Sequence, residues 1–213
     1  MDAATPGSAA ALVRDADRDR WLATLYAPAA MRPALLAVHA LDLELAKVAA
    51  TTTDAMLGEI RLAWWRERLL ALDVEVPAQP VLRALAADVL PRGISGAMLA
   101  RFEDSWLALA DGDVAGFVAA RGAAVGGVIA RLLGGDEAGV DLGRRWAAGE
   151  AARSGYIVDP LPVVRAPAAL RSLAGLATLG ARDLARAVAG LPTEARATPK
   201  RQLLLLCTML TGR

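Results

Sequence analysis

The sequence predicts an all-α helical bundle. Its composition is 55% hydrophobic but only 4% aromatic, so the apolar content is mostly alanine, leucine and valine, which together favour helices over strands. Apolar residues recur at helical spacing along most of the chain, which indicates roughly eight helices joined by short connections. The sequence contains no alternating strand pattern, no Asn-Gly hairpin and no glycine-rich phosphate loop after a strand.

Length and charge narrow the class of protein. The chain has 213 residues, which predicts one domain with a substantial core. Residues 1–13 are small and include proline, glycine and serine, so we expect a flexible tail there and a single domain over 14–213. A net charge of +1 argues against nucleic-acid binding, which needs a basic surface. A lone cysteine, Cys207, excludes an internal disulfide and a cysteine-based zinc site.

The sequence also indicates where the protein works. The first residues lack the basic and apolar regions of a signal peptide. No uncharged apolar run reaches 18 residues, so we expect no transmembrane segment. The expected location is the cytoplasm, with peripheral contact to the inner membrane left open. The alanine content and the preference for arginine over lysine indicate a bacterial source.

The first long helix is expected over residues 34–48. Pro33 suits a first helical position because its missing N–H would be unpaired there. His39, the only histidine, lies inside this helix. As a catalytic base it would need an orienting partner, which Asp42, one turn on, could provide. A packed histidine without a catalytic role is the alternative.

The next helix begins at about Asp54 and is apolar on more than one side. Leu57, Ile60 and Trp64 share one flank, while Trp65 lies on another. A helix that is apolar on most sides is usually central, so we expect this helix to be the most buried element. Trp64 could instead stack on a ligand.

Six further helices complete the expected bundle. Ser95 and Asp113 are candidate N-caps for two of them. Small residues, including Gly122, Ala123 and Gly126, crowd the helix that follows Asp113; they need a packing reason, which a neighbouring helix or a long ligand chain would supply. The expected spans are 81–89, 98–109, 113–134, 139–153, 167–190 and 200–209.

Parts of the chain resemble a known family. Tyr26-Ala27-Pro28, then Arg32-Pro33, and then the run Gly58–Arg66, which reads GEIRLAWWR, resemble the early chain of the squalene/phytoene synthase family. The likeness covers residues 18–70 well and 112–134 in part. It is closest to a divergent branch that includes assembly factors for respiratory complex I. The resemblance implies the isoprenoid synthase fold in a shortened form.

The resemblance also implies a metal site that this chain lacks in sequence. Active members carry two Asp-x-x-x-Asp motifs that hold Mg²⁺ against a substrate diphosphate, because this hard cation prefers oxygen ligands. Aligning the first motif places Ala46 and Ala50 where its aspartates belong. Asp42 and Glu44 point about 200° apart on a helix and cannot replace them. Where the second motif is expected, Glu150 stands alone, so we predict no metal ligands.

The remaining site residues follow from the same resemblance. Arg18 and Arg20 correspond to basic residues that help to hold diphosphate in the family; a solvated helix start is the alternative reading. A cavity for a prenyl chain would be lined by Ala46, Ala50, Trp64, Gly122, Ala123 and Gly126.

Three functions remain open at the level of sequence. The first is a degenerate, non-catalytic member that binds a prenyl or other lipid chain, or assists assembly of a partner protein in a respiratory complex. The second is an active prenyltransferase that condenses two prenyl diphosphates in isoprenoid or carotenoid biosynthesis. The third is a purely structural helical interaction module. The missing aspartates favour the first, because without metal the diphosphate leaving group is not stabilised.

Overall fold

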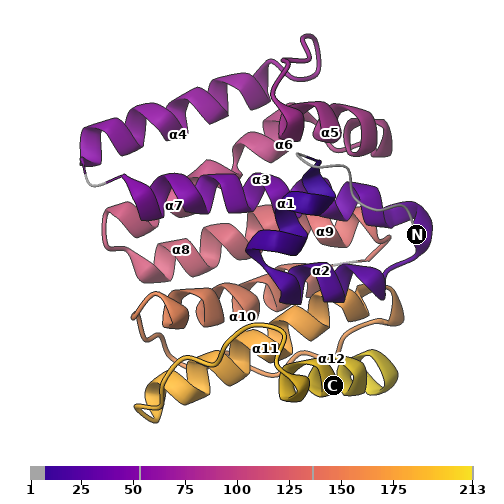
Figure 1. The fold of residues 1–213 in the computed structure, drawn as a ribbon, viewed down its shortest axis with the longest axis vertical. Helices are drawn as coiled ribbons and strands as arrows, with labels where there is room; N and C mark the ends of the chain where they lie inside the picture. The colour runs from indigo at the N-terminus through magenta and orange to yellow at the C-terminus, as the bar shows by residue number, and fades with distance from the viewer. Residues whose placement is uncertain (1–7, 53, 136, 213) are drawn as a thin grey trace.

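A computed structural model describes residues 8–52, 54–135 and 137–212, and this part of the chain forms helices, turns and loops with no β-strand. The all-α prediction is confirmed. Figure 1 shows the elements stacked along the long axis, from α4 at one end to α12 at the other. The α-helices are α1 (Ala9–Ala16), α2 (Arg18–Leu25), α3 (Arg32–Thr51), α4 (Ala55–Leu70), α5 (Pro80–Asp88), α6 (Gly96–Ala100), α7 (Phe102–Ala110), α8 (Val114–Arg121), α9 (Gly127–Leu132), α10 (Ala138–Arg153), α11 (Arg171–Val188) and α12 (Pro199–Thr211).

Side-chain caps fix where several helices begin. Ser95 accepts a hydrogen bond from the N–H of Met98, and Asp113 accepts one from Gly116, as the sequence predicts. Asp54 caps α4 by accepting from Leu57. Each cap satisfies a backbone donor that has no partner within its helix.

The expected flexible tail is shorter than the sequence suggests. Residues 1–7 lie outside the described residues. Ser8 accepts a hydrogen bond from Ala11 and begins α1, which covers residues that we assigned to the tail. Ala11 and Val13 of α1 are buried against the bundle. The prediction of a tail over 1–13 is therefore wrong for 8–13, because alternate apolar residues there pack as a short amphipathic helix.

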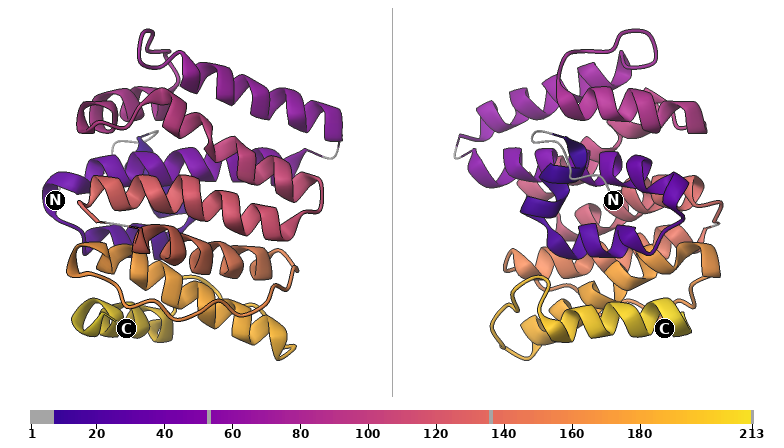
Figure 2. Two further views of the ribbon diagram at one scale, coloured as in Figure 1. Left: turned by 180° about the vertical axis from the view of Figure 1, so that it is seen from behind. Right: turned by 45° about the vertical axis from the view of Figure 1, so that its right-hand side comes forward.

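The prediction that the helix with the two tryptophans is the most buried element is also wrong. Among the α4 residues whose burial the structure describes, 56–70, only Leu62, Trp65 and Leu69 are buried. Trp64 is 42% exposed and Ile60 58% exposed. The helix lies at the edge of the bundle in Figures 1 and 2, where it packs on α6, α7 and part of α3. One apolar flank is thus covered and the other is not.

The centre of the bundle is formed by α3, α8 and α10. Glycines allow α10 to pack closely against the segment Gly122–Gly126, which precedes it in the sequence. A Cβ at Gly126 would lie 2.5 Å from the carbonyl oxygen of Gly139, and one at Gly143 would lie 2.8 Å from the Cα of Gly126. The small residues of 113–134 are therefore explained by a neighbouring helix. Residues Gly122–Gly126 form a π-helical turn at this crossing.

One helical run in the described part of the chain, Val114–Leu132, is long and apolar enough to cross a membrane, with a mean hydropathy of 1.4. In the structure 56% of this window is buried inside the protein. Arg121 lies at its middle and is itself fully buried. The run therefore serves as a core helix here, and the lack of a transmembrane segment stays a prediction.

Candidate functional site: a buried ion network beside an apolar cavity

The polar centre of the molecule is an aspartate held by two arginines. Asp42 of α3 accepts hydrogen bonds from Arg20 of α2 at 2.6 Å and from Nη2 of Arg121 of α8 at 2.6 Å. Nη1 of Arg121 also bonds the second carboxylate oxygen, so this pair is bidentate. All three side chains are at most 1% exposed. Burial raises the pKa of Asp42, but the charges of Arg121 and Arg20 outweigh it and hold that pKa below its usual value.

Glu150 of α10 extends this network towards solvent. Its carboxylate lies 3.2 Å from Arg20 and 3.2 Å from Arg196, and the latter also lies 2.7 Å from Asp17. Burial would raise the pKa of Glu150, but Arg196 and Arg20 lower it well below the usual range. Glu150 is therefore ionised and paired.

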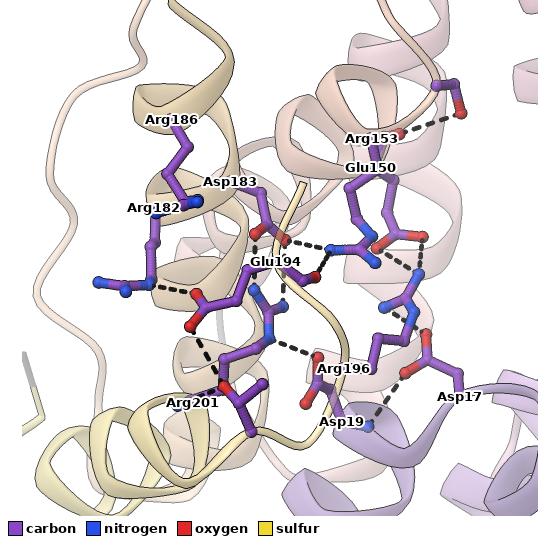
Figure 3. Close-up of polar contacts among 12 residues, drawn as sticks. Asp17, Asp19, Glu150, Arg153, Arg182, Asp183, Arg186, Glu194, Arg196 and Arg201 are labelled. Carbon is purple, nitrogen blue, oxygen red and sulfur yellow. Dashed lines mark hydrogen bonds and ion pairs between the residues drawn. The ribbon is translucent and has the colours of Figure 1, made fainter. Parts of the chain in front are cut away.

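A further set of ion pairs ties the C-terminal helix to the bundle. Figure 3 shows Arg201 of α12 between Asp19 and Asp183, with contacts of 2.8 and 2.6 Å. The N–H of Ala197 donates to Asp19 at 2.8 Å. The segment before α12 is thus bonded to α2 and α11, and it brings Arg196 to Glu150.

His39 is buried beside the ion network and does not line the main cavity. Its ring meets Trp146 edge-on, with the centroids 5.6 Å apart. Burial, reinforced by the charge of Arg20, lowers the pKa of His39 to about 3. Its Nδ1 is buried without a hydrogen-bond partner among the described residues. Asp42, expected to orient it, is bonded to arginines instead, so the arrangement does not make His39 a catalytic base.

An apolar cavity of about 590 Å³ opens beside this network. It lies between the end of α3, the start of α4, the α7–α8 turn and the end of α10. Its volume falls within the usual range for a small-molecule site, and such sites are mostly apolar. The apolar side chains that line it are Ala46, Val48, Ala49, Ala50, Leu62, Trp106, Leu109, Ala110 and Phe117.

The predicted cavity residues divide into two groups. Ala46 and Ala50 line the cavity, where the family alignment placed them. Trp64 does not; it projects from the outer part of α4, edge-on to Trp65. Gly122 and Gly126 do not either, because they contact α10. Ala123 borders a separate surface groove with Arg101 and Arg131.

The two predicted diphosphate contacts, Arg18 and Arg20, lie in different surroundings. Arg18 is exposed and lies 5.7 Å from the ring of Trp21. Arg20 is buried, and its guanidinium is bonded to carboxylates of the protein itself. Its charge is therefore already compensated.

Sequence reasoning missed most of the ion network. None of Arg121, Asp183, Arg196 and Arg201 was singled out as a site residue. The available signal was a charged residue in the middle of an apolar helix, which is buried only when it is paired. That signal implies partners without identifying them, because they come from distant parts of the chain.

Comparison with known proteins finds a family match for the first part of the chain. Residues 13–106 match the squalene/phytoene synthase family model. Over these residues, which make up less than half of the 213, the chain is similar to the squalene/phytoene synthases. Its fold is accordingly the all-α isoprenoid synthase type. No curated protein and no solved structure gives a significant match to the chain. The matched region ends at Trp106 and includes Asp42, Ala46 and Ala50.

The residues at the cavity do not fit the Mg²⁺ that the family implies. Alanines occupy both positions of the first acidic motif, and Glu150 is paired with arginines. Within the described residues, no group of three or more histidine, cysteine, aspartate or glutamate side chains could hold a metal ion. We therefore derive no step through magnesium.

Proposed function

We propose that this protein is a non-catalytic member of its family that binds a prenyl or similar lipid chain. The observation that supports the proposal most is the composition of the cavity. Ala46 and Ala50 provide an apolar wall at the place where a synthase needs carboxylates. Burial of apolar surface favours binding by roughly 25 cal/mol for each Å² removed from water. A hydrocarbon chain can gain this free energy without a metal.

The buried ion network supports the same proposal. A diphosphate needs cations that are free to bind it. Arg20, Arg121 and Arg196 are all bonded to Asp17, Asp42 or Glu150, and Glu150 lines the cavity. Releasing any of them would leave a buried carboxylate without its partner, which is costly. Arg20, Arg121 and Arg196 are therefore not free to bind a diphosphate leaving group, and the described residues include no metal-binding cluster of carboxylates.

The proposal is tested by direct binding of farnesol, an uncharged prenyl alcohol. Ala46→Phe should fill the cavity and weaken binding at least tenfold, since Ala46 is half-buried in its wall. Ala185→Phe is the matched control, because Ala185 is an exposed alanine on α11 outside the cavity lining. Undetectable farnesol binding by the folded wild-type protein would rule out the proposal.

An activity assay separates this function from the family reaction. Purified protein with prenyl diphosphates and Mg²⁺ should release no pyrophosphate above the rate without enzyme. Sustained turnover would show that the protein is an active prenyltransferase. The resemblance to respiratory assembly factors, and peripheral contact with the inner membrane, stay predictions that this assay does not address.

A further inference from the structure

The charged side chains that line the cavity all have the same sign. They are Asp54, Glu59, Asp111 and Glu150, and no lysine or arginine is among the described lining residues. A cavity walled by one sign of charge in a low-dielectric surround concentrates ligands of the opposite sign. The cavity itself defines the site, and its carboxylates determine which head group it accepts.

Three of these carboxylates are not neutralised by the protein. Glu150 is compensated by Arg20 and Arg196. By contrast, Asp54, Glu59 and Asp111 take part in no ion pair within the described residues; Asp54 only caps α4. Among the described residues, Arg61 brings a positive charge to the rim, where it donates to the lining residue Thr52 at 3.0 Å. Three carboxylates and one guanidinium leave the mouth with a net negative charge.

The same residues argue against a metal as the compensating ion. No three acidic side chains in the described structure lie close enough together to hold one. An organic cation does not need converging ligands, because a negative potential and aromatic ring faces suffice. Tyr156 lines the mouth and is 39% exposed. Trp106 and Phe117 lie deeper, and Arg121 already lies 5.3 and 5.7 Å from their rings.

From this we propose that the cavity selects an amphiphile with an apolar chain and an amine head group, and that it disfavours an anionic head. The chain occupies the apolar depth beside Ala46 and Phe117. The ammonium group lies at the mouth, among Asp54, Glu59 and Asp111. The inference rests on the proposed function, because it requires that a chain enters this cavity.

The test compares three ligands that share one chain: farnesylamine, farnesol and farnesyl phosphate. A primary amine is protonated at neutral pH. We expect farnesylamine to bind about tenfold more tightly than farnesol, a difference of about 1.4 kcal/mol, and farnesyl phosphate to bind more weakly than farnesol. The preference for the amine should shrink in high salt, which screens exposed charges.

A charge-neutral variant tests whether these carboxylates cause the preference. In Asp54→Asn/Glu59→Gln/Asp111→Asn the amine should lose its advantage while farnesol binds as before; asparagine keeps the N-cap of α4. Glu75→Gln is the control, because Glu75 is an exposed residue in the loop after α4, outside the cavity lining. An amine that binds no better than farnesol, or an unchanged preference in the triple variant, would overturn the inference and leave the chain site intact. Failure of all three ligands to bind would overturn the proposed function as well.

Discussion

Two regions of α3, little more than one turn apart, use their residues in opposite ways. Around Asp42 every charged group has a partner, and the side chains are sealed from water. Around Ala46 and Ala50 the helix offers only methyl groups to a cavity, and the carboxylates near its mouth lack ion-pair partners among the described residues. The comparison shows that α3 carries a buried, paired charge at Asp42 and an apolar surface at the cavity.

The difference also shows how Glu150 should be interpreted. It is the residue common to both regions, since it lines the cavity and pairs with Arg20 and Arg196. An acidic residue at a cavity floor can be a metal ligand, a proton donor or a structural partner. Its paired and ionised state assigns it to the third role.

The largest expected effect comes from breaking the charged region. Asp42→Ala leaves Arg20 and Arg121 buried without their shared partner, and removal of one member of a buried pair costs roughly 3–5 kcal/mol. Urea unfolding of the two proteins measures the loss. Asp141→Ala is the control, since its pair with Arg144 is exposed and should contribute under about 1 kcal/mol. A similar, small loss for both variants would mean that the network does not hold the core together.

The close contact between α10 and the helical segment around Gly126 can be tested at two adjacent glycines. Gly126→Ala forces a Cβ against Gly139 and Gly143 of α10, which should cost about 1–3 kcal/mol, as overpacking does. Gly127→Ala meets nothing within 4 Å and should stabilise the protein, by about 0.5–1 kcal/mol. Thermal unfolding gives both signs. If Gly126→Ala is also stabilising, α10 and the segment around Gly126 are not in close contact, and there is room for a ligand between them.

A pH series tests the state of the charged region without disturbing its packing. The pKa of His39 is about 3 in the fold and 6.5 when unfolded. Its contribution is therefore present above pH 6.5 and is lost as pH falls towards 3, because only the unfolded chain takes up the proton. Between pH 7 and 5 the loss should be about 2 kcal/mol. His39→Gln should remove this part of the slope, and an identical pH dependence in both proteins would show that His39 is solvated.

The sequence predicted the all-α class and several helix starts because these depend on local signals. Ser95 and Asp113 accept hydrogen bonds from N–H groups three residues away, so their role as N-caps can be predicted from the local sequence. The burial of α4 could not be predicted. The spacing of its apolar residues shows that two flanks are apolar, but it does not show which flank a neighbouring helix covers. Trp64 and Trp65 are adjacent in sequence but differ in burial, because α6 and α7 pack against only one flank of α4.

The candidate site was predictable only where family alignment supplied a position. Ala46 and Ala50 were assigned to a cavity because the early chain resembles the family pattern, and both line the cavity of the structure. Gly122 and Gly126 were assigned to the cavity because small residues suit either a ligand or a helix crossing, and the crossing with α10 is decided by distant residues. Besides the nearby Asp17, the partners of Arg20 are Asp42 in α3 and Glu150 in α10, and local periodicity carries no information about these two.

The most direct test of the account is the affinity for farnesyl diphosphate with and without Mg²⁺, measured by calorimetry beside farnesol. If Ala46 and Ala50 leave no metal site, and the buried arginines stay bonded to carboxylates of the protein, magnesium should change the affinity by less than twofold. The diphosphate should also bind no more tightly than the alcohol. A magnesium-dependent gain of a hundredfold, about 2.7 kcal/mol, would contradict the account and show that recognition of the diphosphate has survived.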